Sequence, residues 1–579
     1  MKVIIKGTGT EINLTQRDFV ASGGQAAIYT RNGIAFKVYH NPSDALPTGK
    51  ITELQAITDS RVIKPEQILV DPSGSPVGYT TKFIKDSYVM CQLFPKAFRD
   101  REHVDHTMIR DLVRQLQETV GNVHKTGILI VDLNEMNFLV DKGFGKVFAI
   151  DVDSYQTPHY RAPALMDSVR DWSVKSNQWT TLSDWYSFGV ISFQLFTGIH
   201  PFKGQYHGTK QELKGKIPSD PDDDSFAVTR RRMINNVSIF CPDVKTPACT
   251  YPVSVIPPAY KAWFEAMFVQ GKRCLPPNEP FGGAAIVVPT IQALFGTANL
   301  DIVELGSYEG QISRLWSDGS KLVVVTDKGV WLDSARTNVT APKHAACGFS
   351  PLAGRAVLAN GDTDIPTLTN LTDRVAVAFG LDVAETVSYD GRIYVRTPDH
   401  VYEIVLTDAG SQVLATTKAV VNVLPHATKL YSGVVIQNML GSVFVSLLSG
   451  PGVARQIRIK ELDNYKILDA KFDSGVLMVV GVKKGKYDRL VFRFDSDDTY
   501  DLRMVSDITP AGLNFVTLDS GVCVCITEEE KLEMFKAIKG HAALKIVEDK
   551  ILDSEMRLAK HAGKLLFYRG NKVFQMSMK

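Results

Sequence analysis

Residues 127–155 read GILIVDLNEMNFLVDKGFGKVFAIDVDSY, and they decide how the first half of the chain is interpreted. Asp132 is followed five residues later by Asn137, and Asp151 comes fourteen residues after Asn137. On two adjacent turns, these side chains would surround one pocket. Such a set suits phosphoryl transfer, because one carboxylate can accept a substrate proton while the other two groups hold Mg²⁺. Since Asp and Asn are also common turn formers, the rest of the chain has to support this interpretation.

The composition indicates a globular protein and argues against several classes of partner. Of the 579 residues, 44% are hydrophobic and 22% are charged. The net charge of +2 gives no signal for nucleic acid or an anionic membrane. No apolar run reaches the roughly 18 residues that span a bilayer, and the first residues lack the apolar core of a signal peptide. Seven scattered cysteines without a zinc-binding spacing fit reduced thiols, so we expect a cytoplasmic protein.

The first 90 residues predict a small lobe of five strands and one helix. Residues 20–42, VASGGQAAIYTRNGIAFKVYHNP, contain an Asn-Gly turn between two strand-like segments, which is typical of a β-hairpin. Lys37 is unusual because it lies inside an apolar strand, where its charge needs a partner or an edge position. The helix expected over residues 48–60 carries Glu53.

From Asp105 onwards the pattern becomes helical, because apolar residues recur every three or four positions. A second, mostly apolar helix is expected over residues 185–197, where Gly198 ends it. Residues 276–298 are rich in Pro and Gly and are typical of a linker.

Beyond residue 300 a motif recurs seven times, in which a polar turn ends in glycine and an apolar strand follows. Successive glycines are 35, 37, 42, 42, 46 and 42 residues apart. Periods near 40 in an all-strand region are typical of propeller blades of four strands. We therefore predict a seven-bladed β-propeller, and one or two β-sandwiches with coincidental turns are the alternative. The repeat glycines are Gly319, Gly354, Gly391, Gly433, Gly475, Gly521 and Gly563.

The first 290 residues resemble the protein kinase superfamily, and they are most similar to a divergent bacterial and phage branch with DLN and IDxDS[FY]Q motifs. The resemblance rests on VDLNEMNFLV at 131–140, AIDVDSYQ at 149–156 and GIHPFKGQYHG at 198–208. It implies an α+β, two-lobed fold that is followed by the all-β propeller. The expected segments are a kinase-like domain over 1–290 (small lobe about 1–90, large lobe about 91–290), a linker over 291–300 and a propeller-like domain over 301–579.

The resemblance also implies roles for individual residues. Asp132 matches the catalytic base, and Asn137 and Asp151 match the Mg²⁺ ligands. Lys37 matches the strand lysine that contacts the phosphates of ATP, and Glu53 is its expected ion-pair partner. The alternatives are turn chemistry for the acidic trio and an exposed surface pair for Lys37 and Glu53. The residues expected to bind ATP are Ala21, Ser22, Gly23, Gly24, Gln25, Ala26 and Lys37.

Several positions depart from the family pattern. Ile130 and Val131 replace the usual His-Arg, so nothing at that place can receive an activation-loop phosphate, and we predict activity without such phosphorylation. Asn134 stands where a catalytic lysine is common, which leaves the acceptor type open. Asp153 replaces the glycine of the metal motif, where it could bind metal or cap the turn.

Two further expectations concern the architecture of the large lobe. The segment Ala162-Pro163-Ala164 lacks the usual glutamate, and Arg273 lies near where the partner of that glutamate would be. A lost ion pair there should loosen the substrate side of the lobe. Asp184 matches a structural aspartate that braces the catalytic loop.

The sequence therefore predicts an ATP- and Mg²⁺-dependent protein kinase that phosphorylates protein hydroxyls, Ser or Thr more than Tyr. The propeller would recruit the substrate or another protein partner, and we expect no binding to nucleic acid or membrane. A pseudokinase scaffold whose propeller binds proteins, and a small-molecule kinase of the same fold, are the alternatives. The expected location is the cytoplasm, or the host cytoplasm if the chain is virus-encoded.

Overall fold

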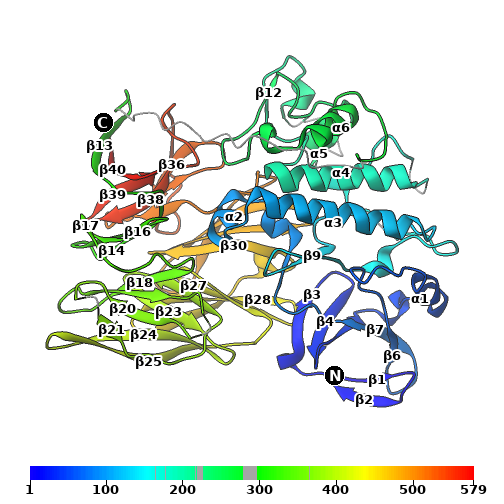
Figure 1. Ribbon diagram of the computed structural model, residues 1–579, viewed down its shortest axis with the longest axis horizontal. Coiled ribbons are helices and arrows are strands. Elements are labelled where there is room, and N and C mark those ends of the chain that lie inside the picture. The colour runs from blue at the N-terminus through cyan, green and yellow to red at the C-terminus, as the bar shows by residue number, and fades with distance from the viewer. Residues whose placement is uncertain are drawn as a thin grey trace.

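The computed structural model describes residues 1–163, 165–175, 178–215, 217, 224, 226–277, 296–363, 365–373 and 375–579. Figure 1 shows an N-terminal region, residues 1–277, which contains the long helices, and a C-terminal β region, residues 296–579, which lies beside it. The first half of the linker predicted at 291–300 lies outside the described residues. Among the helices of the described residues, none has the length and apolar content of a membrane span.

The small lobe is a seven-stranded antiparallel sheet in the order β2-β1-β6-β7-β5-β4-β3. The prediction of five strands was wrong, because residues 1–22 form three short strands rather than one. The expected helix is also shorter than residues 48–60. The elements are β1 (Lys2–Ile5), β2 (Thr10–Asn13), β3 (Phe19–Ser22), β4 (Ala26–Arg31), β5 (Ile34–Tyr39), α1 (Thr48–Leu54), β6 (Gln67–Val70) and β7 (Pro76–Lys82).

Two long helices, α3 (His106–His124) and α4 (Thr181–Thr197), lie side by side at the centre of the large lobe (Figure 1). Asp105 caps α3, because its carboxylate accepts the N–H groups of Thr107 and Met108, both at 2.8 Å. The apolar period of α3 buries one face, whereas α4 is buried almost throughout, as its apolar sequence predicts. The other helices are α2 (Lys96–Glu102), α5 (Ala227–Ile234) and α6 (Pro258–Phe268).

A β-hairpin positions the residues predicted to bind metal. Strands β9 (Phe138–Asp141) and β10 (Val147–Ala149) pair antiparallel, and β9 also pairs with β8 (Ser87–Val89). Phe138 faces Ala149 in the register, so the residue before β9 and the residues after β10 lie at the same end of the hairpin. A small separate pair, β11 (Gln205–Tyr206) and β12 (Val244–Lys245), lies further along the chain.

The described residues of the C-terminal β region form seven four-stranded antiparallel sheets. Six contain consecutive strands, and the seventh joins β13, at the start of the region, to β38–β40 at its end. Each repeat glycine lies in the turn before the second consecutive strand of one sheet and has a positive φ, which glycine adopts at little cost.

The strands of this region are β13 (Leu300–Ser307), β14 (Ile312–Ser317), β15 (Leu322–Thr326), β16 (Gly329–Leu332), β17 (Ala335–Arg336), β18 (Ala345–Phe349), β19 (Ala356–Asn360), β20 (Thr367–Asn370), β21 (Val375–Val377), β22 (Glu385–Tyr389), β23 (Arg392–Arg396), β24 (His400–Ala409), β25 (Gln412–Asn422), β26 (Thr428–Tyr431), β27 (Val434–Met439), β28 (Ser442–Gly450), β29 (Val453–Arg458), β30 (Lys466–Asp473), β31 (Val476–Lys483), β32 (Lys486–Phe494), β33 (Tyr500–Val505), β34 (Phe515–Thr517), β35 (Val522–Ile526), β36 (Lys531–Lys536), β37 (Leu544–Glu548), β38 (Arg557–His561), β39 (Lys564–Arg569) and β40 (Lys572–Met578).

Hydrophobic clusters join each of these sheets to the next along the chain. Buried side chains of β14–β17 pack with those of β18–β21, and the same holds for every later pair of neighbouring sheets. A further cluster joins the sheet β13-β40-β39-β38 back to β14–β17 through residues such as Trp331 and Leu566. The seven sheets therefore form a closed cycle of packed neighbours.

The N-terminal region and the β region share one hydrophobic core. The core of the large lobe continues into Val480, Val482 and Tyr487 of the sheet β30–β33, and Figure 1 shows β30 next to α2. Beside this shared core, Nζ of Lys203 lies 2.6 Å from Oδ1 of Asp507 across the boundary between the two regions. The two regions are therefore packed together rather than joined only through the chain between them.

Candidate functional site

The loop that carries Asp132 has a strained backbone that a buried carboxylate supports. Val131 has a φ of 61°, a conformation that is rare for a β-branched residue. Asp184, on α4, accepts the backbone N–H groups of Ile130 and Val131 at 2.8 and 2.9 Å. Its Oδ2 also lies 2.9 Å from Nε2 of His124. Asp184 thus has the bracing position that the resemblance implied.

Asp132 contacts both its own loop and a later segment of the large lobe. Its Oδ1 accepts the backbone N–H of Met166 at 2.8 Å, and its Oδ2 lies 3.3 Å from the amide nitrogen of Asn137. The same amide nitrogen donates to the carbonyl oxygen of Asp132 at 2.9 Å. Burial raises the pKa of Asp132 above its usual range, although these hydrogen bonds oppose the shift.

Lys37 projects from β5 into the site, where it contacts two carboxylates. Its Nζ pairs with Oδ1 of Asp151 and lies 3.0 and 2.9 Å from the two carboxylate oxygens of Asp153. Burial disfavours the charge of Lys37, but Asp151 and Asp153 together hold its pKa above the usual value. Asp151 itself has a φ of 60°, which directs the chain sharply after β10.

The prediction of an ion pair between Lys37 and Glu53 was wrong. Glu53 instead binds His159, in the segment after Asp151, with 2.6 Å between Oε1 and Nδ1. The reason is the orientation of the short helix α1, which turns Lys50 inward, where its Nζ donates to the carbonyl oxygen of Asp153 at 2.6 Å. Glu53 therefore points toward the loop, and Asp153 takes the place beside Lys37.

The glycine-containing loop lies between β3 and β4, as expected for a phosphate-binding hairpin. The N–H of Gly23 donates to the carbonyl oxygen of Ala26 at 2.9 Å, which closes the turn. A Cβ added to Gly23 would meet only one atom, at 3.9 Å, and one added to Gly24 would meet nothing within 4 Å. Among the described residues, none lies close enough to require small residues there, so the open space fits the approach of a phosphate group. Ala21 and Ser22 end β3, Gln25 lies in the turn, and Ala26 begins β4.

Asn137 and Asp151 lie at the same end of the β9–β10 hairpin. The N–H of Ile150 donates to the carbonyl oxygen of Asn137 at 2.9 Å, which fixes the two segments against each other. Their amide and carboxylate oxygens are the ligands that Mg²⁺ prefers. Within the described part of the chain, no group of three or more His, Cys, Asp or Glu side chains could hold a metal ion. The amide and carboxylate of this pair are donor types that fit a Mg²⁺ shared with a phosphate ligand.

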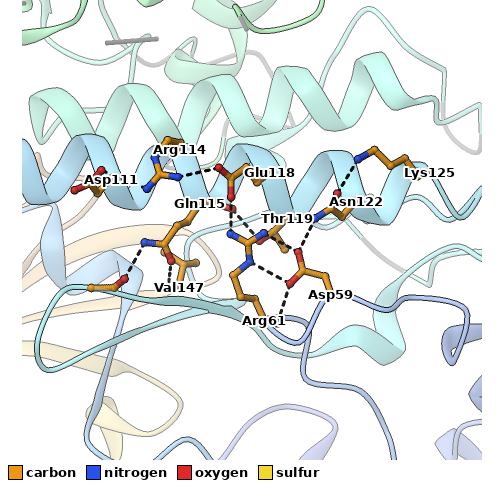
Figure 2. Close-up of polar contacts among 11 residues, drawn as sticks. Asp59, Arg61, Asp111, Arg114, Gln115, Glu118, Thr119, Asn122, Lys125 and Val147 are labelled. Carbon is orange, nitrogen blue, oxygen red and sulfur yellow. Dashed lines mark hydrogen bonds and ion pairs between the residues drawn. The ribbon is translucent and has the colours of Figure 1, made fainter. Parts of the chain in front are cut away.

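An ionic network behind the site fastens the small lobe to α3 (Figure 2). Arg61, which follows α1, donates to both carboxylate oxygens of Asp59, at 3.1 and 2.8 Å, and to Glu118 of α3 at 3.0 Å. Asn122 of α3 donates to Asp59 at 3.0 Å. Although burial opposes it, these donors lower the pKa of Asp59 to about 2. Because the carbonyl oxygen of Arg61 accepts the N–H of Ala149 at 2.8 Å, the network also anchors the strand that leads to Asp151.

The structure also corrects the expectation for Arg273. Its guanidinium binds Asp171 through two hydrogen bonds, Nε–Oδ2 at 2.6 Å and Nη2–Oδ1 at 2.7 Å. Asp171 thus supplies the carboxylate that the missing glutamate would have supplied, and the ion pair is not lost. Ala164, where that glutamate was expected, lies outside the described residues.

The β region reaches the segment beside Asp132, which the sequence did not indicate. A Cβ on Gly485, in the β31–β32 turn, would lie 2.6 Å from Sδ of Met166 and 2.8 Å from Oγ of Ser168. A larger residue there would force the side chains of Met166 and Ser168 to shift. Two residues later, the hydroxyl of Tyr487 donates to Glu135 of the catalytic loop at 2.9 Å.

Comparison with known proteins finds a family whose sequence pattern matches part of this chain. Residues 80–236 match the protein kinase domain. The chain is 28% identical over 102 residues to ribosomal protein S6 kinase alpha-2 of Mus musculus, which is 17% of this chain and 14% of that protein. It is 30% identical over 119 residues to cGMP-dependent protein kinase 2 of Homo sapiens, 18% of this chain and 14% of that protein. It is 29% identical over 126 residues to a probable myosin light chain kinase of Dictyostelium discoideum, 19% of this chain and 37% of that protein.

The chain thus spans between 14% and 37% of the length of these relatives. The matched segment contains Asp132, Asn137 and Asp151, whereas Lys37 and Glu53 precede it. The segment that holds Asp132, Asn137 and Asp151 therefore matches the protein kinase domain.

Proposed function

We propose that this chain is a protein kinase that uses ATP and Mg²⁺ to phosphorylate hydroxyl groups of proteins, with Ser or Thr as the expected acceptor. The observation that carries the proposal is the convergence of four side chains from three separate segments. Lys37 contacts Asp151, Asn137 contacts Asp132, and the β9–β10 hairpin joins the two pairs. A scaffold has no physical need for all four.

Each residue has a definable task in this proposal. Asp132 would orient the acceptor hydroxyl and accept its proton, since the N–H of Met166 and the amide nitrogen of Asn137 already hold its carboxylate in place. Lys37 would exchange its contact with Asp151 for the phosphates of ATP, which the loop from Ala21 to Ala26 would cover. Asn137 and Asp151 would hold Mg²⁺, which, when bound, neutralises the charge that develops on the phosphates. Catalysis would then rest on positioning and electrostatics.

We also propose that the β region is a seven-bladed propeller that follows a kinase-like domain of about residues 1–290. The support is the closed cycle of seven packed sheets and the pairing of β13 with β40, which joins the start of the region to its end. Its turn at Gly485 lies against Met166, beside Asp132, so a protein bound near this turn would be held close to the acceptor site. The β region would therefore recruit the substrate or a partner, and the expected compartment is the cytoplasm.

The test is transfer of labelled phosphate from ATP with Mg²⁺ by the full chain and by Asp132→Asn and Asp151→Asn. The matched control is Asp111→Asn, which removes an exposed carboxylate of α3. We expect each site variant to lose more than about a hundredfold in rate and the control to keep its rate. A wild-type chain that binds Mg-ATP but labels neither itself nor any protein of a lysate would favour the pseudokinase scaffold. Acid hydrolysis of the labelled product identifies the acceptor residue.

A further inference from the structure

We propose that Asp153 is the positioning residue for Lys37 and replaces Glu53 in that role. The inference rests on the proposed function, because it assigns the part of the site that holds the phosphate-binding lysine. Nζ of Lys37 lies 2.9 and 3.0 Å from the two carboxylate oxygens of Asp153. The two side chains are only 11% and 8% exposed, so removal of Lys37 would leave the carboxylate of Asp153 without a cationic partner, and removal of Asp153 would leave Lys37 with Asp151 as its one anion among the described residues.

Asp153 is itself held in place by contacts that a metal ligand would not need. The hydroxyl of Tyr39, two residues after Lys37 on β5, donates to Oδ2 of Asp153 at 2.7 Å. Its backbone lies in the single helical turn Val152–Ser154, and its carbonyl oxygen accepts Nζ of Lys50 at 2.6 Å. The carboxylate and the carbonyl of one residue thus bind the small-lobe sheet and helix α1 at the same time.

The contrast with Asp151 explains why Lys37 needs this second carboxylate. The side chain of Asp151 is 45% exposed, whereas that of Asp153 is 8% exposed. If Asp151 turns toward a metal ion, Lys37 loses one of its two anions while it stays buried. Asp153 would keep the lysine charged and aimed at the site without leaving its own contacts.

Glu53 cannot perform this task in the observed arrangement. Its carboxylate binds both the ring nitrogen and the backbone N–H of His159, at 2.6 and 3.3 Å. Helix α1 meets the site through a lysine rather than a glutamate, because Lys50 is buried and faces Asp153. Glu53 therefore connects α1 to the loop after the metal aspartate, and its removal leaves the contacts of Lys37 unchanged.

The test compares Asp153→Asn with Glu53→Gln, which are equivalent changes of charge to amide. The first readout needs no nucleotide: the full chain is treated with an amine-acetylating reagent, and the labelling of Lys37 is followed by peptide mass spectrometry. Because a lysine released from a carboxylate pair is more available to the reagent, we expect labelling to rise about threefold or more in Asp153→Asn. The labelling of Lys37 in Glu53→Gln should match that in wild type.

The second readout is the equilibrium binding of a fluorescent ATP analogue with Mg²⁺. We expect the Kd to rise about tenfold in Asp153→Asn and to stay within about twofold in Glu53→Gln. Asp153→Glu, which keeps the charge, should recover part of the loss, and circular dichroism checks that each variant folds. Unchanged Lys37 labelling in Asp153→Asn, or a larger effect in Glu53→Gln, would overturn the assignment. If wild type binds no nucleotide, the proposed function fails, while the labelling experiment still decides the role of Asp153.

Discussion

The hydrogen bond from Tyr487 to Glu135 allows a sharp test of how closely the β region is coupled to the catalytic loop. The hydroxyl lies 2.9 Å from Oε1 of Glu135. The two residues are 3% and 1% exposed, and the other carboxylate oxygen of Glu135 has no hydrogen-bond partner among the described residues. Tyr487→Phe therefore removes the side-chain donor from a buried carboxyl group and leaves the packing of the ring intact.

The expected cost follows from this geometry. Leaving a buried acceptor unsatisfied costs about 1 to 3 kcal/mol, and we expect about 2 kcal/mol here, which is about a thirtyfold change in the unfolding equilibrium. The matched control is Tyr500→Phe, which removes a bond of 2.7 Å to Glu461 at an exposed site and should cost about 0.5 kcal/mol or less.

Urea denaturation of both variants measures the loss in free energy of unfolding. Hydrogen exchange shows which part of the chain is destabilised, and we expect faster exchange for the backbone amides of residues 133–137 in Tyr487→Phe alone. Equal shifts of the urea midpoint in the two variants, or unchanged exchange in the catalytic loop, would refute the coupling between Tyr487 and this loop.

Three further predictions concern stability. Burial lowers the pKa of His200 to about 3, so the unfolded state takes up a proton before the folded state does as the pH falls. The contribution of neutral His200 to stability is therefore full above about pH 6.5 and falls by about 2 kcal/mol at pH 5. Urea titrations across this pH range should show that His200→Gln abolishes the loss. Asp171→Asn leaves the guanidinium of Arg273 without its anion and should lower the free energy of unfolding by about 3 kcal/mol, as measured by urea denaturation. A loss below about 1 kcal/mol would mean that the ion pair has little structural role. Gly521→Ala should cost about 1 kcal/mol of stability, because the only strain on the new side chain is the φ of 73°. Gly433→Ala should cost at least about twice that, because its Cβ would also lie 2.4 Å from a backbone oxygen. Equal shifts of the melting temperature in the two variants would contradict this reasoning.

Features set by nearby residues could be predicted from the sequence. Asn137 and Asp151 lie together because one short hairpin separates them, and its alternating apolar residues are visible in the sequence. The repeat glycines mark turns because each needs a positive φ, which leaves a local signal. The strand count of the small lobe was less accurate, since strands of four residues leave only a weak pattern.

Contacts between distant segments could not be predicted in this way. The partner of Lys37 depends on the orientation of α1, and a shift along a short helix decides whether Lys50 or Glu53 points inward. Asp171 reaches Arg273 only through the packing of segments about a hundred residues apart. No local pattern of the β31–β32 turn indicates that Gly485 rests on Met166.

The contact between Gly485 and Met166 has a consequence for how substrate specificity could change during evolution. Under the proposed function, a peptide that approaches Asp132 would meet both Met166 and Gly485, which lie more than 300 residues apart in the chain. Changes in the β31–β32 turn would then alter which peptides fit while the residues proposed to bind phosphate and metal stay the same. A kinase arranged in this way could diversify its targets through a hairpin that takes no part in the chemistry.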